Sequence, residues 1–414
     1  MTLAAFRVRS FRFQWPADLL TSLAFEMETV ILSWYVMVQT GSVLLLTAFG
    51  SLLFLGTLLA PMYGVLSDRL GGRAVLFAMR SVYVVLALIL AILSLSGRLT
   101  PLWVFAIATV AGLLRPNDLV LRNSLIGETI SSQHLMGAVG LSRATADCAR
   151  VMGALAGAEL STVLGIGPAY VLVTAFYAVS LALTFGVARR HPVPDPGGAP
   201  RAPLTGVTTV GIVSPSRGRD LKDGLLHVLR TPALLAPMWL AFLINLTAYP
   251  VSNGLLPYVA KNVYAVGATG LGWLVASFAL GGLLGSIATI VTGGPRRPER
   301  VMLVCAAIWY AVLLGFGHLG SLQAGFLALL LAGFVQNVAM ISMTTSLLRA
   351  AGERFRGRVM GVRMLAVYGL PLGLIASGAL IDLIGYPLTI STLSVVGLVF
   401  TLLIAIRWRA SLWR

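Results

Sequence analysis

The stretch from Gly64 to Arg73, GVLSDRLGGR, is short and polar, and it separates two long apolar stretches, 43–63 and 74–95. A helix needs about 20 apolar residues to cross the hydrocarbon core of a bilayer, so each flanking stretch predicts a membrane-spanning helix. Working outward with the same criterion gives twelve stretches with approximate ends. They cover residues 14–38, 43–63, 74–95, 102–120, 135–164, 168–187, 233–259, 271–291, 301–318, 322–347, 359–383 and 388–406. The sequence therefore predicts an all-α membrane protein, since it lacks the ten-residue alternating segments of a membrane barrel.

Composition excludes several other classes of protein. Only 11% of the 414 residues are charged, whereas a soluble domain is about a quarter charged. The net charge of +16 comes from short basic runs between apolar stretches, which argues against a nucleic-acid partner. The two cysteines, Cys148 and Cys305, lie far apart in apolar stretches, so neither a disulfide framework nor metal-ligand spacing is present. We expect no metal, no cofactor and no nucleic-acid partner.

The distribution of Lys and Arg predicts the topology. With the amino terminus inside, most of the 30 basic residues fall in cytoplasmic segments, and only Arg98 and Lys261 fall in outer ones. By the positive-inside rule, both termini are cytoplasmic. The apolar run after the basic residues 1–12 is too long for a signal-peptide core and predicts a first spanning helix. We expect a multi-pass protein of the bacterial cytoplasmic (inner) membrane.

A long Pro-, Gly- and Arg-rich loop divides the helices six and six. The expected domains are an amino-terminal bundle at 1–188, a cytoplasmic linker at 189–232 and a carboxy-terminal bundle at 233–414. Apolar residues at helical spacing in 220–229 predict a short interfacial helix in the linker, the alternative being a solvated tether. Gly137 and Arg143 recur as Gly357 and Arg363, both 220 residues further on. A repeat of this kind usually places the substrate site between the halves, near the middle of the membrane.

The opening stretch resembles the G-x-L-x-D-R-x-G-R-[RK] loop of the major facilitator superfamily. It matches at six positions, including Leu66, and departs at Gly72. The resemblance implies twelve transmembrane helices in two six-helix pseudo-repeat bundles. It also implies a cytoplasmic latch that stabilises the outward-facing state, formed by Gly64, Asp68, Arg69, Gly71 and Arg73. The alternative is a basic turn that only obeys topology.

Further motifs are similar to the drug and siderophore exporter branch of the family, which includes the enterobactin exporter. They are Phe11, Arg12, Trp15, Ser22, Glu26, the run 40–42, Leu256 with Pro257, and the run 356–359. Exporters of the superfamily often carry G-P-x-x-G-G in the fifth helix. The corresponding stretch here, 153–158, lacks the proline and one glycine. Its small residues still allow close helix packing.

Ionisable residues inside the predicted helices gather in the first half. Each costs about 2.5–3.5 kcal/mol at a helix centre on insertion scales, so such residues normally face a cavity or a partner. At about 100° per residue, one stripe of the fifth helix carries Arg143, Asp147, Arg150 and Gly157. A polar stripe of the first helix carries Asp18, Ser22, Glu26, Thr29 and Ser33, and Glu28 projects the other way. Arg115 lies near the cytoplasmic end of the fourth helix.

These charges supply the candidate proton-coupling residues. Only hydroxyl groups accompany Glu26 along its stripe, so burial is expected to favour its protonated form. We therefore expect Glu26 to carry the coupled proton, with Glu28 as second candidate and Asp147 as an electrostatic partner of arginine. The alternatives are that Glu26 is a static hydrogen-bonded acid and that Asp147 forms a fixed pair with Arg143 or Arg150.

The candidate substrate-binding residues come from both halves. Arginine pairs bidentately with carboxylates, which predicts an anionic cargo. The candidates are Arg115, Arg143 and Arg150 in the first half and Asn245, Tyr249 and Asn337 in the second. Alternatively, Arg115 and Asp18 lie in the headgroup region, and the uncharged residues only form hydrogen bonds between helices.

The resulting hypothesis is a monomeric secondary transporter in the lipid bilayer, which exports a small amphipathic or anionic compound by alternating access and is driven by protons. No nucleotide-binding loop is present, so ATP is not expected to drive it. The alternatives are an importer or proton symporter of a small metabolite, a membrane-embedded enzyme, and a receptor or scaffold that does not transport. The scattered His134, His191, His227 and His318 match no catalytic motif.

Overall fold

The computed structural model describes residues 6, 8–59, 62, 63, 66, 70–129, 132–187 and 226–412. Most of these residues lie in helices, and there is no strand among them. Ten of their helices are long and apolar enough to cross a membrane, and a shorter apolar helix covers Val43–Thr57. The predicted all-α membrane fold is confirmed.

The first half, residues 9–184, contains the following helices. Their bounds are α1 (Arg9–Thr40), α2 (Val43–Leu52) followed by the 3₁₀ helix η2 (Leu55–Leu59), α4 (Gly72–Leu95), α5 (Pro101–Thr129), α6 (Ser132–Val163) and α7 (Ile166–Thr184). Helix α1 ends at Gly41, whose positive φ of 64° and hydrogen bond to Met37 O close the helix in the left-handed conformation that glycine adopts freely. The next helix begins at once, so α1 and α2 are antiparallel neighbours.

The second half begins with an interrupted span. Helix α9 (Pro232–Thr247) is followed by the π-helix η3 (Pro250–Gly254), the short α10 (Leu256–Tyr258) and a second π-helix, η4 (Val259–Val263). The prolines at 250 and 257 have no N–H to donate, so the regular hydrogen-bond pattern is broken there. The remaining helices are α11 (Ala268–Val291), α12 (Pro298–Phe316), α13 (Leu322–Ala350), α14 (Gly352–Ala366), α15 (Gly369–Ile384), α16 (Tyr386–Arg407) and α17 (Arg409–Leu412).

One predicted range differs from the structure, and another is described only in part. The fourth span was expected to end near residue 120, but α5 continues to Thr129, because Asp118 and Arg122 are buried and paired rather than solvated. Of the helix expected at 220–229, residues 226–230 are described and are helical. The rest of the predicted linker lies outside the described residues.

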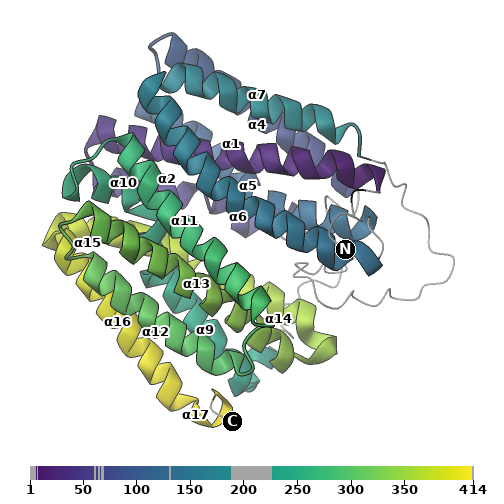
Figure 1. The fold of residues 1–414 in the computed structure, drawn as a ribbon, viewed down its shortest axis with the longest axis vertical. Coiled ribbons are helices and arrows are strands. Elements are labelled where there is room, and N and C mark those ends of the chain that lie inside the picture. The colour runs from purple at the N-terminus through teal and green to yellow at the C-terminus, as the bar shows by residue number, and fades with distance from the viewer. Residues whose placement is uncertain are drawn as a thin grey trace.

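The helices form two halves that lie side by side, residues 9–187 in purple to blue and residues 232–412 in green to yellow (Figure 1). We call the end of the molecule where α1 begins and α16 ends the terminal end, and the opposite end, where α1 passes into α2, the far end. Helix α6 packs against α11, and α2 packs against α15. These two contacts join the halves.

Several contacts between the halves lie toward the far end. A Cβ at Gly272 of α11 would stand 2.5 Å from Ala158 Cβ and 3.1 Å from Ala154 O of α6, so the two helices approach closely there. Lys261 Nζ donates to Met37 O at 2.9 Å, in the last turn of α1. The hydroxyl of Thr269 donates to Glu159 at 3.1 Å.

Candidate functional site

Helices α1 and α6 approach closely in the middle of the first half. A Cβ at Gly153 would lie 2.7 Å from Glu26 Cβ, and one at Gly157 would lie 2.7 Å from Met27 Cα. The stretch 153–158 is the one that departs from the exporter motif. Its glycines pack against α1, and its alanines pack against α11. This packing brings the side chains of α1 next to those of α6.

The packing of α1 against α6 produces an ion pair between Glu26 and Arg150. Arg150 Nε lies 3.4 Å from Glu26 Oε1. The Glu26 side chain is 27% exposed and that of Arg150 is 46% exposed, although both residues lie near the middle of long helices. Sequence reasoning expected only hydroxyl groups beside Glu26. That premise is wrong, because the close approach at Gly153 places an arginine from another helix against its carboxylate.

Side chains from the second half complete this region. The hydroxyl of Tyr249, which lies between α9 and η3, accepts a hydrogen bond of 2.7 Å from Gln336 of α13. Arg143, Arg150 and Arg363 are all close enough to act electrostatically on that hydroxyl. We call Glu26, Arg143, Asp147, Arg150, Tyr249 and Arg363 the central site, because they bring charged and polar groups of both halves together.

Asp147 pairs along its own helix. Its carboxylate lies 3.6 Å from Arg143 Nε and also interacts electrostatically with Arg150. The Asp147 side chain is 9% exposed and that of Arg143 is 61% exposed. The sequence-based pairing of Asp147 with arginine is therefore present in the structure.

Glu28 and Arg115 form a separate pair inside the first half. Arg115 binds the Glu28 carboxylate and donates to Thr29 at 3.1 Å, and the Tyr177 hydroxyl donates to Glu28 at 2.9 Å. Both charged side chains are almost fully buried. Arg115 is therefore occupied by partners within the first half, and its placement does not favour direct contact with cargo.

The two asparagines proposed for cargo have local partners. Asn245 donates to Ala241 O of its own helix at 2.9 Å. Asn337 is buried and donates to Gly282 O at 2.7 Å and to Ser286 at 3.1 Å, which joins α13 to α11. The geometry thus favours the hydrogen-bonding alternative for Asn337, whereas Tyr249 lies at the central site.

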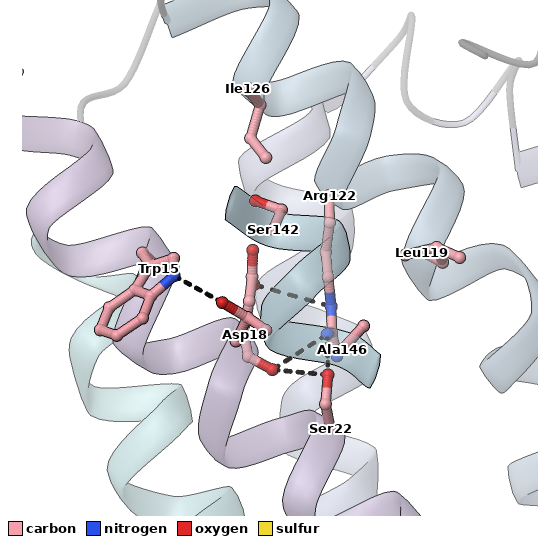
Figure 2. Close-up of a pocket in the computed structure, with 9 residues that line it drawn as sticks. Trp15, Asp18, Ser22, Leu119, Arg122, Ile126, Ser142 and Ala146 are labelled. Carbon is pink, nitrogen blue, oxygen red and sulfur yellow. Dashed lines mark hydrogen bonds and ion pairs between the residues drawn. The ribbon is translucent and has the colours of Figure 1, made fainter. Parts of the chain in front are cut away.

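Nearer the terminal end, four buried charges join α1, α4 and α5. Asp18 binds Arg80 and lies 3.6 Å from Arg122, which also binds Asp118. Figure 2 shows Asp18 and Ser22 of α1 directed toward Arg122 in a small pocket that α6 closes with Ser142 and Ala146. The two acids balance the two arginines, so this charge cluster ties the first half together. Asp18 is therefore buried among its ion-pair partners inside the first half.

The predicted latch is only partly described. Gly64, Asp68 and Arg69 lie outside the described residues. Gly71 precedes α4 with a positive φ of 84°, and Arg73 donates to Phe185 O at 2.8 Å and Thr184 O at 3.3 Å, at the end of α7. An arginine at a helix carboxyl end satisfies carbonyls that lack helical partners and complements the helix dipole.

Three charged residues of these clusters were missed as site residues. Arg80 stands well inside an apolar stretch, and Asp118 and Arg122 have the i, i+4 spacing of a helical ion pair, so both signals were present in the sequence. The internal repeat in the sequence includes Arg363. Its position near Tyr249 was not predictable, because it depends on the packing of helices that are distant in sequence. Among the described residues, no group of three or more His, Cys, Asp or Glu side chains could hold a metal ion.

The fold and the mid-helix charges are those of a membrane transporter built from two halves. The sequence profile of the Major Facilitator Superfamily matches residues 15–371, so the chain belongs to that family of transporters. The chain is 26% identical over 378 residues to the multidrug efflux pump Tap of Mycolicibacterium fortuitum, covering 88% of this chain and 87% of the relative.

Solved structures share the fold at low identity. The nucleoside transporter NupG superposes with a TM-score of 0.70 at 14% identity, covering 97% of this chain and 98% of that one. The human organic anion transporter MFSD10 gives 0.65 at 18%, covering 96% and 99%. A bacterial homologue of the human lysosomal transporter Spinster, in an inward-facing and unoccupied conformation, gives 0.70 at 14%, covering 97% and 96%.

Proposed function

We propose that this transporter is a proton-coupled exporter of small amphipathic or anionic compounds that works by alternating access. The observation that carries the proposal is the partly exposed pair of Glu26 and Arg150 at the central site. A mid-membrane acid that can lose its partner is suited to bind and release a proton. Export is supported by the similarity to a protein named as a multidrug efflux pump.

Coupling arises if cargo and proton compete for Glu26. A cargo that offers a cation or a hydrogen-bond donor to Glu26 needs the ionised carboxylate, whereas a proton removes that charge. The two therefore bind alternately, and a proton moving inward exchanges for cargo moving outward. Asp147 remains next to Arg143 and Arg150 and keeps part of their charge balanced when Glu26 is protonated.

The alternating states follow from the contacts between the halves. With the terminal end on the cytoplasmic side, as the basic residues predict, the far-end contacts of Lys261 and Gly272 close the outer side. This arrangement corresponds to an inward-facing state. In the outward-facing state these contacts open, and the latch around Asp68 and Arg73 closes the cytoplasmic side. Glu28 is the second proton candidate, but it must first leave Arg115 and Tyr177.

One observation favours a second candidate, a proton symporter or importer. Arg150 is 46% exposed and can also bind an anion. An anion on Arg150 would release Glu26, which would then take up a proton, so anion and proton would bind together. Whether cargo and proton are exchanged or move together therefore depends on whether the cargo contacts Glu26 or Arg150.

The direction of proton movement separates the two candidates. Purified protein in vesicles that contain a pH-sensitive dye is exposed to amphipathic cations, zwitterions and carboxylates. Exchange predicts that cargo entering the vesicle drives protons out, so the interior becomes more alkaline. Acidification of the interior with cargo uptake supports symport, and no proton movement with any transported compound contradicts both.

A further inference from the structure

Arg363 is the one charge at the central site without an acidic partner among the described residues. The other two arginines have one each, since Arg143 lies 3.6 Å from Asp147 and Arg150 lies 3.4 Å from Glu26. Arg363 Nη1 instead donates to the neutral Thr344 hydroxyl at 2.6 Å. The charges of the two pairs cancel, so Arg363 leaves one positive charge in excess.

The internal repeat explains why this charge is unbalanced. Arg143 and Arg363 are repeat equivalents, 220 residues apart. The same offset takes Asp147 to Val367 and Arg150 to Leu370, so the second half keeps the arginine and lacks the acid. A charge at membrane depth is costly without a partner, which makes an arginine without a carboxylate a place for a ligand to supply one.

The surroundings of Arg363 suit an anionic group on an apolar body. Thr344 accepts one guanidinium hydrogen and donates its own to Met340 O at 2.8 Å, which fixes the Arg363 side chain between α14 and α13. Tyr249 lies within electrostatic reach of Arg363. The guanidinium still has N–H donors for a carboxylate, and the partly buried Met340, one turn from Thr344, offers a thioether that adapts to different apolar shapes.

We infer that Arg363 is the anion-binding residue of the cargo site and that it selects cargo bearing a carboxylate or a similar single negative group. This inference rests on the proposed function, because it assigns the substrate class of the same site. An anion on Arg363 displaces no acid, so its binding requires no proton uptake. Recognition of the anion is thereby separate from the proton chemistry of Glu26, and it is compatible with exchange.

The test compares 4-alkylbenzoates with the matched 4-alkylbenzamides, which have the same apolar body without the charge. Binding to purified protein is measured by the change in tryptophan fluorescence. The wild type is expected to prefer the carboxylate by about tenfold or more, and Arg363→Gln is expected to remove that preference. Arg363→Lys keeps the positive charge but loses the paired N–H donors that bind both oxygens of a carboxylate. It is therefore expected to keep part of the preference. Thr344→Val is expected to weaken it, and Arg98→Gln, which removes one positive charge from an exposed site, is expected to leave it unchanged.

The outcomes distinguish this inference from the proposed function. If folded Arg363→Gln protein keeps the full preference for carboxylates, or if the wild type has none, the anion site at Arg363 is refuted, while proton-coupled transport of other compounds stands. If carboxylates bind in a manner that depends on Arg363 but no compound moves protons in vesicles, the proposed coupling fails and the anion site stands.

Discussion

Glu26 of α1 and Arg150 of α6 form an ion pair whose two members are both partly exposed, although they lie near the middle of long membrane helices. The nearby pair of Glu28 and Arg115 has the same chemistry, but its side chains are only 6% and 11% exposed. A buried pair is costly to open because both charges would lose their compensation. From this difference in exposure we propose that Glu26 changes its protonation state during transport and that Glu28 has a structural role.

The close approach of α1 and α6 is expected to determine the geometry of the Glu26 pair. Gly157→Val would push a branched side chain into the backbone of Met27, and overpacking of this kind costs about 1–3 kcal/mol. We expect the unfolding temperature in detergent to fall by several degrees. Gly315→Ala, where a Cβ meets nothing within 4 Å, is the matched control. Equal unfolding temperatures for the two variants would contradict the packing account.

The buried pair of Glu28 and Arg115 gives a stability prediction. Glu28→Gln leaves the Arg115 charge buried without its partner, which typically costs about 3–5 kcal/mol. The double variant Glu28→Gln with Arg115→Met is expected to recover much of that loss, as measured by unfolding in detergent. Asp382→Asn, at an exposed acid, is the control. A double variant that is less stable than Glu28→Gln alone would show that the pair has another role.

Lys261 is expected to hold the far end closed. Its ammonium group joins η4 to the last carbonyls of α1, where a helix end favours positive charge. Lys261→Met should increase the population with long distances between spin labels placed at Gln39 and Asn262, both exposed positions. Lys261→Arg keeps a cationic donor and should resemble the wild type. An unchanged distance distribution in Lys261→Met would remove this contact from the account of gating.

The latch gives a prediction about transport without a change in folding. Asp68→Asn is expected to abolish transport at normal expression, because the residue is expected to bias the conformational equilibrium and not to contact cargo. Ligand binding by the purified variant should persist. Transport at the wild-type rate would mean that the stretch 64–73 is only a basic turn.

The sequence was sufficient for the class of fold and for part of the site. Long apolar stretches and the GVLSDRLGGR motif depend on local composition, so they predicted the membrane helices and the family. The pairing of Asp147 with Arg143 was also predictable, since both residues lie on one helix face.

Partners from different helices could not be found in the same way. The pairs of Glu26 with Arg150 and of Asp18 with Arg80 depend on how α1 packs against α6 and α4. The angular position of Glu28 was read correctly, but the arginine it meets lies 87 positions further along the chain. Helix periodicity predicts on which side of its helix a residue lies. It does not predict which residue of another helix packs against that side.

The most direct test of the central claim is proton-coupled transport by Glu26→Gln in vesicles. Wild-type protein should move cargo against its gradient when a pH gradient is imposed, and it should also exchange labelled for unlabelled cargo without one. Glu26→Gln is expected to keep exchange and lose the response to the pH gradient, whereas Asp382→Asn, at an exposed acid, should keep both. Transport by Glu26→Gln with an unaltered dependence on the pH gradient would contradict the account and place the proton site elsewhere.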